Sequence, residues 1–208
     1  MGIINQLATS LNRRDEKPNQ ELAKKLSEKK DIPAIKELTE LIKSKDKNIQ
    51  SDCIKVLYEI GERNPELISG YDKLFIELLD SKNNRLVWGA MSALDCITSA
   101  NPHEIYKNLA KILKIVDKGS VITRDHGVNI LIQLASVKKY QEDALILLLE
   151  QFKTCPTNQL PMYAEKALAA ISDKFKDRFI KTMQLRIVEV EKESKQKRIE
   201  KVIKKLQA

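Results

Sequence analysis

The chain has 208 residues, of which 42% are hydrophobic and 32% are charged. This balance excludes a wholly disordered protein, because there are enough apolar side chains to build a core. The formal net charge is +8, but residues 172–208 alone hold twelve Lys or Arg and six Asp or Glu, so the rest of the chain is close to neutral. That distribution argues against a nucleic-acid binder, which needs a basic surface to neutralise phosphates.

Other features exclude further classes of protein. No apolar run approaches the roughly 18 residues of a membrane span, and the N-terminus lacks a secretory signal. The cysteines Cys53, Cys96 and Cys155 are odd in number and far apart, which favours reduced thiols in a cytoplasmic protein. No nucleotide-binding, nucleophile or zinc motif is present. We expect His103 to be solvated and His126 to make a packing contact, so the sequence predicts no catalytic residue, no metal and no cofactor.

The first 30 residues predict two short helices that cap the fold, over residues 2–13 and 20–29, with Pro18 between them. Both lie outside the periodic pattern that follows. Terminal units of a repeat array are atypical in this way, because they close the core with a polar outer face.

Residues 31–172 carry an internal repeat. Leucines recur at a spacing of 37 residues, and similar residues accompany each of them four before, one before and three after, which is one face of an α-helix. A fixed period of this length indicates stacked supersecondary units that share one core. The leucines are Leu57, Leu94, Leu131 and Leu168.

Each repeat is predicted to contain two helices. Apolar runs near 34–42, 74–79, 109–116 and 145–152 form the first helices, and the leucine-bearing segments form the second. Asn64-Pro65 and Asn101-Pro102 recur between repeats, where Asn suits a left-handed helix end and Pro suits the first turn of the next helix.

One column on the second helices holds only small residues: Cys53, Ala90, Gly127 and Ala164. A small residue lets another backbone approach closely, so the two helices of a repeat should cross there. Gly inside a helix costs up to about 1 kcal/mol relative to Ala. We therefore attribute Gly127 to close packing rather than to flexibility.

Residues 173–208 are predicted to form a basic helix that caps the array and then projects beyond it. No Pro or Gly interrupts the segment from about 177 to 206, and residues 191–198 contain no apolar side chain. An apolar stripe follows, which we expect to dock on a partner protein or on a second copy of the chain, giving a homodimer. The stripe consists of Ile199, Val202, Ile203 and Leu206.

These repeats resemble the HEAT/armadillo family of helical repeats. The resemblance rests on an Asp in the loop and on the apolar and small positions of the second helix, as in Asp117, Arg124, Gly127, Leu131 and Leu134 of the third copy. It implies an all-α fold, an α-α superhelix or solenoid of about four HEAT-like helix pairs with helical caps. It also implies a protein-binding scaffold whose second helices line a concave surface.

The candidate partner-binding residues lie on the second helices, opposite the leucines. Trp88 is the only tryptophan of the chain and follows Arg85 by one turn, and Trp beside Arg is a frequent anchor of interfaces. The alternative is that Trp88 packs between neighbouring repeats. The full set is Trp88, Arg85, Arg124, Asp125, Asn129, Tyr58 and Asp95.

A second hypothesis comes from the same resemblance. HEAT-like DNA glycosylases of the alkylpurine type cradle DNA and hold the lesion with Trp, Asp and Arg, and Trp88, Asp95, Arg124 and Asp125 offer these residue types. The nearly neutral repeats argue against DNA binding. The sequence therefore favours a non-enzymatic scaffold for a protein partner, with a glycosylase or another nucleic-acid-binding protein as the alternative.

Overall fold

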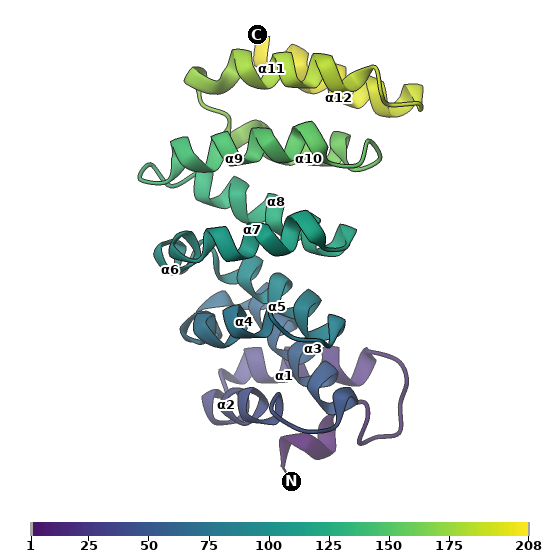
Figure 1. Ribbon diagram of the computed structural model, residues 1–208. Helices are drawn as coiled ribbons and strands as arrows, with labels where there is room; N and C mark the ends of the chain where they lie inside the picture. The colour runs from purple at the N-terminus through teal and green to yellow at the C-terminus, as the bar shows by residue number, and fades with distance from the viewer. Residues whose placement is uncertain (1, 208) are drawn as a thin grey trace. The chain divides into compact units, whose positions relative to one another are not determined.

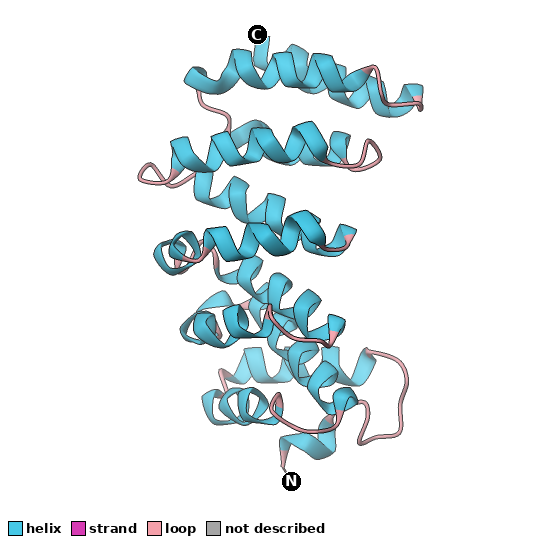
Figure 2. Ribbon diagram, viewed as in Figure 1, coloured by secondary structure: helices cyan, strands magenta, loops and turns pink. Residues whose placement is uncertain are grey.

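The computed structural model describes residues 2–207, which are helical and contain no strand (Figures 1 and 2). They fall into two compact units, Met1–Gly127 and Val128–Ala208, and the boundary lies within the helix α8 (Val121–Ala135). The predicted all-α class is confirmed. No helix among the described residues is both long enough and apolar enough to cross a membrane.

The first unit contains the 3-10 turn η1, the helix α1, the pairs α2/α3 and α4/α5, then α6, α7 and the start of α8, with short elements between them. The helix α3 packs on α2, and α5 packs on α4. The elements are η1 (Ile3–Gln6), α1 (Lys17–Lys29), α2 (Ile32–Leu41), α3 (Lys47–Arg63), η2 (Pro65–Leu67), η3 (Ser69–Tyr71), α4 (Asp72–Leu78), α5 (Asn84–Ile97), α6 (Pro102–Lys107), α7 (Leu109–Lys118) and the start of α8.

Side chains fix where several of these helices begin. The carboxylate of Asp46 accepts from the amide of Asn48 at 2.7 Å before α3, and the side chain of Asn83 accepts from the amide of Arg85 at 3.1 Å before α5. Such caps satisfy amides that have no partner within the helix. They set the register in which α3 and α5 present their residues.

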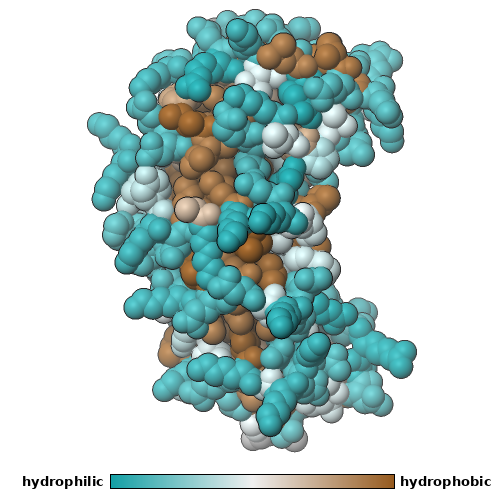
Figure 3. Space-filling view, viewed as in Figure 1, coloured by the Kyte–Doolittle hydropathy of each residue, from teal (hydrophilic) through white to brown (hydrophobic). Residues whose placement is uncertain are grey.

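The leucine column is buried as predicted in three copies. Leu57, Leu94 and Leu131 have no exposed surface. Leu168 is half-exposed, because α10 ends at Ala167 and Leu168 begins the 3-10 turn η4 (Leu168–Ala170). Figure 3 shows polar side chains over most of the visible face of the molecule, with apolar side chains gathered in patches among them.

The close packing predicted for Gly127 is confirmed. A Cβ atom on Gly127 would lie 2.2 Å from Cγ2 of Val116, the last buried residue of α7. The first and second helices of this repeat therefore cross where the small residue stands.

Two local predictions are wrong. Asn64 and Asn101 have φ of −152° and −135° rather than left-handed values, and each directly precedes the next helical element; Pro65 and Pro102 do begin that element. At the N-terminus only Ile3–Gln6 are helical, as a 3-10 turn, and Asn12 with φ of 52° turns the chain away.

The second unit contains the rest of α8, then α9 (Gln141–Thr154), α10 (Leu160–Ala167), α11 (Asp173–Ile187) and α12 (Glu193–Gln207). The helix α11 packs on α9, and α12 packs on α10 and α11. The C-terminal segment is therefore another helix pair of this unit.

The prediction of one long projecting helix is thus wrong. The chain turns at residues 188–192 because Val190 is buried and its carbonyl accepts a hydrogen bond of 2.7 Å from Nε2 of Gln196. The stripe that was expected to dock elsewhere is buried inside the unit, so it offers no exposed surface for a partner or a second copy. Exposed fractions are 0%, 3%, 8% and 9% for Ile199, Val202, Ile203 and Leu206.

Candidate binding cleft

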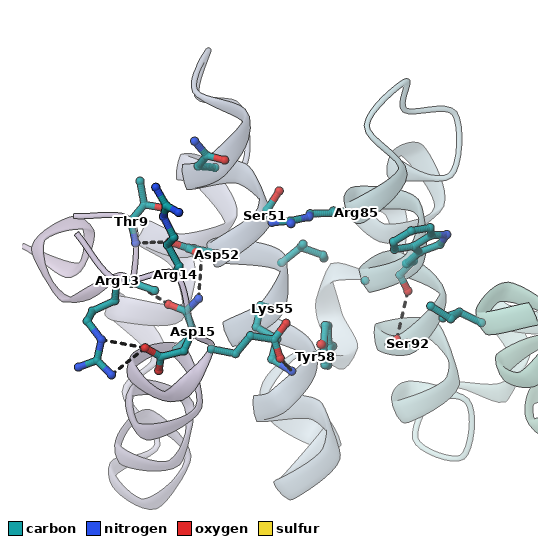
Figure 4. A pocket seen from close by; sticks show the side chains of 18 of the residues that line it. Thr9, Arg13, Arg14, Asp15, Ser51, Asp52, Lys55, Tyr58, Arg85 and Ser92 are labelled. Atoms are coloured by element: carbon teal, nitrogen blue, oxygen red, sulfur yellow. Dashed lines mark hydrogen bonds and ion pairs between the residues drawn. The ribbon is translucent and has the colours of Figure 1, made fainter. Parts of the chain in front are cut away.

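A cleft of about 790 Å³ opens in the first unit (Figure 4). Its walls come from the segment 8–19 and from the second helices α3 and α5, with Ile122 of α8 at one side. Clefts that take ligands have volumes of roughly 300–1,000 Å³, so this one is large enough for a segment of another chain. It is lined by Ala8, Thr9, Asn12, Arg13, Arg14, Asp15, Glu16, Asn19, Asn48, Ser51, Asp52, Ile54, Lys55, Tyr58, Arg85, Trp88, Gly89, Ser92 and Ile122.

The segment 8–19 is held against α3 by two polar side chains. The carboxylate of Asp52 accepts from the amide of Thr9 at 2.7 Å and from Nδ2 of Asn19 at 2.8 Å. Oδ1 of Asn19, which is buried, accepts from the amide of Ala8 at 3.0 Å. Each of these groups is satisfied inside the protein, and together they fix one wall of the cleft.

The middle of α3 carries a compact charge cluster. Nζ of Lys55 lies 2.9 Å from carboxylate oxygens of both Glu16 and Glu59, and 4.7 Å from the centre of the Tyr58 ring. Burial alone would lower the pKa of Lys55, but hydrogen bonds with Tyr58, Glu59 and Glu16 outweigh it and raise the pKa. Lys55 is therefore a permanent cation whose charge two carboxylates offset.

The opposite wall is α5, which contributes Trp88 and Arg85. Figure 4 shows Arg85 reaching from α5 towards Ser51 of α3. The two helices come close below these side chains because Gly89 has no Cβ; one built there would lie 2.4 Å from Cγ1 of Ile54. Trp88 is half-buried, so it lines the cleft and is not part of the closed core.

The structure brings together three of the seven candidate residues, Tyr58, Arg85 and Trp88. Arg124 and Asp125 are half-buried on α8 and do not line the cleft. Asn129 belongs to the second unit, where its Oδ1 accepts from Nζ of Lys166 at 3.0 Å.

Asp95, the remaining candidate residue, also lies outside the cleft and contacts His126. Its carboxylate lies 2.8 Å from Nδ1 of His126, and Nε2 of His126 lies 2.8 Å from Oγ of Ser92. His126 thus makes satisfied contacts, as expected. The Trp, Asp and Arg side chains considered for a glycosylase are therefore not gathered around one cavity.

The contacts from Ser92 to His126 and from His126 to Asp95 follow the order of a hydrolytic triad. The surroundings of these side chains, however, do not suit acyl transfer. Ser92 lies in the middle of α5, where the backbone amides bond within the helix and offer no oxyanion hole. Its hydroxyl also lies 3.1 Å from the carbonyl oxygen of Trp88. The three side chains tie α5 to α8.

Other nucleophiles and metal ligands are also poorly placed in the described residues. Burial raises the pKa of the Cys53 and Cys96 thiols to about 12, so both are protonated at neutral pH. No group of three or more His, Cys, Asp or Glu within residues 2–207 has the arrangement of a metal site.

Sequence reasoning missed the cleft residues that precede α1. The charged run Arg13-Arg14-Asp15-Glu16 was the available signal, but it lies outside the 37-residue period, so nothing in the pattern placed it beside α3. Asp52 and Asn19, which hold this wall, were likewise not singled out.

No protein-family model matches the chain, and no curated protein matches it in sequence. Solved structures do match. A designed armadillo repeat protein in complex with the peptide (KR)4 is similar with a TM-score of 0.69 and 17% identity over 98% of each chain. An armadillo repeat protein designed for modular peptide recognition has a TM-score of 0.67, with 15% identity over 97% of each chain. An engineered protein has a TM-score of 0.65, with 23% identity over 99% of each chain.

At these identities the likeness defines the fold. The chain has an armadillo/HEAT-like helical-repeat fold, as the sequence period and the resemblance of its motifs predicted.

Proposed function

We propose that this protein is a non-enzymatic binding module that holds a segment of a protein partner in the cleft between residues 8–19, α3 and α5. The observation that carries the proposal is the cleft of about 790 Å³ with a half-buried tryptophan in its wall. Trp and Arg provide large contact areas and dominate the binding energy of many interfaces. Trp88 and Arg85 stand one helical turn apart on that wall.

The fold gives further support. Two of the similar solved proteins were designed as armadillo repeats, one for modular peptide recognition and one in complex with a peptide. An extended segment suits such a cleft, because a partner chain can follow it while its side chains enter between the helices. The absence of oxyanion donors around Ser92 and the high pKa of the thiols favour binding over catalysis.

The test begins with selection of peptides from a random display library against the full chain. Peptides that use the cleft should bind at least about tenfold more weakly to Trp88→Ala, a loss of about 1.4 kcal/mol. The matched control is Val121→Ala, which removes an exposed apolar side chain that does not line the cleft. It should leave the affinity within about twofold.

Thermal unfolding of both variants separates binding from folding. We expect the Tm of Trp88→Ala to stay within a few degrees of the parent protein, because the side chain is half-exposed. Selected peptides that bind Trp88→Ala as tightly as the parent protein would contradict the proposal. So would a selection that yields no binder at all.

A further inference from the structure

Some of the cationic side chains that line the cleft are in ion pairs, and others are not. The guanidinium of Arg13 lies 2.7 Å from the carboxylate of Asp15, and Lys55 is paired with Glu16 and Glu59. Arg14 and Arg85 line the same cleft, are exposed, and have no ion-pair partner among residues 2–207. Two cations of the cleft are therefore available to a ligand.

The carboxylates of the cleft are already engaged. Asp15 is held by Arg13, and this hydrogen bond lowers the pKa of Asp15. Glu16 is held by Lys55, and Asp52 accepts the amide of Thr9 and the side chain of Asn19. A basic ligand would compete with these contacts, whereas an acidic ligand meets Arg14 and Arg85 without breaking any.

The same cleft also presents apolar surface. Ile122 is 43% exposed although it is a large aliphatic residue, and it lines the cleft with the half-buried Trp88. Covering this apolar surface removes it from water, which favours binding of a ligand with an apolar side chain. An apolar side chain between two acidic ones would match what the cleft presents.

We propose that the occupant of the cleft is an acidic peptide segment. Its Asp or Glu carboxylates pair with Arg14 and Arg85, and an apolar side chain of the segment covers Trp88 and Ile122. Guanidinium groups bind carboxylates in a two-point geometry, which gives direction as well as attraction. This inference rests on the proposed function and specifies the chemistry of the partner.

A nucleic acid is the weaker candidate on the same charges. A single strand places a phosphate on every nucleotide and needs a series of cations along its path. Of the cations that line the cleft, Arg14 and Arg85 alone lack an ion-pair partner within residues 2–207, while Asp15, Glu16 and Asp52 line the same cleft. These carboxylates would repel a phosphate chain, but a peptide can pass them with neutral side chains.

The test is fluorescence anisotropy of labelled probes with the full chain at two salt concentrations. The probes are the peptide Glu-Asp-Leu-Glu-Asp-Leu-Glu-Asp, its counterpart with Lys-Arg for each Glu-Asp, its counterpart with Ser-Gly, and an oligothymidylate of eight nucleotides. We expect the acidic peptide to bind most tightly, and its affinity to fall as salt rises.

Charge reversal locates the contact. The double variant Arg14→Glu/Arg85→Glu should weaken acidic-peptide binding at least tenfold. Lys82→Glu changes charge by the same amount as one of these substitutions, three residues before Arg85 and outside the cleft lining, and should alter binding less than twofold. Full retention of acidic-peptide binding by the double variant would overturn the inference.

The outcomes separate this inference from the proposed function. Tighter binding of the Lys-Arg or Ser-Gly peptide, lost in Trp88→Ala, overturns the acidic preference and leaves the cleft as a peptide site. Preference for oligothymidylate overturns the acidic-peptide inference and favours nucleic acid. No binding of the acidic peptide likewise overturns the inference, whereas the proposed function fails only if the library selection also yields no cleft-dependent peptide.

Discussion

Glu59 lies buried on α3 below the cleft, where it accepts a 2.7 Å hydrogen bond from Arg63 and pairs with Lys55 at 2.9 Å. Burial by itself raises the pKa of Glu59, but hydrogen bonds from Lys55 and Arg63 outweigh it, so the pKa lies below its ordinary value. A carboxyl whose pKa is lower in the folded protein stabilises the fold above its unfolded pKa, about 4.3. That contribution is lost as the pH falls through the folded pKa.

Glu59→Gln is therefore expected to reduce the free energy of unfolding by about 1.5–3 kcal/mol at pH 7, the range for hydrogen bonds to charged groups. Because protonated Glu59 makes the same kind of neutral contacts as Gln, the difference in stability between the two proteins should shrink as the pH falls below about 4.3 and through the lower folded pKa of Glu59. Urea unfolding at several pH values measures it. A difference that is constant with pH would contradict the assignment.

Gly127→Ala should destabilise the protein by about 1–3 kcal/mol, because the added Cβ would lie 2.2 Å from Cγ2 of Val116 in a packed interface. Gly70→Ala is the matched control, since a Cβ there would meet no heavy atom within 4 Å. It should be neutral or slightly stabilising. Chemical denaturation of both variants gives the comparison. Equal stability would show that α7 can shift to make room for the added Cβ.

For single residues, the sequence predicts those roles that follow from a position in the repeat. Gly127 could be explained in advance because its column is small in every copy. Asn64 and Asn101 were assigned the wrong backbone conformation because helix ends depend on the local path to the next element. That path here includes short helical turns at Pro65 and Pro102.

Among the elements, the N-terminal segment 8–19 forms a wall of the cleft although it is mostly not helical. Asp52→Ala would remove the acceptor for the amide of Thr9 and for the side chain of Asn19. We expect a loss of about 1–3 kcal/mol, because both donors are left without a partner. Hydrogen exchange of the segment should become faster by at least about tenfold.

Ser51→Ala provides the control for this substitution. Its hydroxyl donates only to the carbonyl of Lys47 within α3, so the exchange of residues 8–19 should not change. Equal exchange rates in Asp52→Ala and the parent protein would mean that other contacts hold the wall.

The helix α12 is the second element whose role the structure redefines. Ile199→Asp should destabilise the second unit by about 3 kcal/mol or more, because it places a charge at a fully buried position between α10 and α12. Lys201→Asp, on the exposed side of α12, should have little effect. Thermal unfolding distinguishes the two variants. An unchanged melting profile for Ile199→Asp would indicate that the apolar stripe of α12 is not packed inside the unit.

Element boundaries were predictable only where the sequence marks them. Capping residues mark the starts of α2 and α3, whereas Pro18, which was predicted to separate two helices, lies in the first turn of α1. The turn between α11 and α12 has neither Pro nor Gly, and the contact from Gln196 to Val190 that stabilises it exists only after the chain has turned. A continuous helix was therefore the natural prediction from sequence.

For the whole molecule, the fold follows from a period that can be read directly from the sequence, and solved armadillo repeats match it over nearly the whole chain. The domain boundaries at residues 30 and 172 remain predictions. The cleft could not be predicted in the same way, because its segment 8–19 lies outside the period and reaches α3 through tertiary contacts with Asp52. The wall of the cleft formed by residues 8–19 is therefore recognised only from the structure.

Hydrogen exchange of the full chain, with and without a selected peptide, tests whether a peptide segment binds between residues 8–19, α3 and α5. We predict slower exchange in residues 8–19, 47–63 and 84–97, and no change in α11 and α12. Protection confined to α11 and α12, with none around Trp88, would contradict binding of the peptide in the cleft.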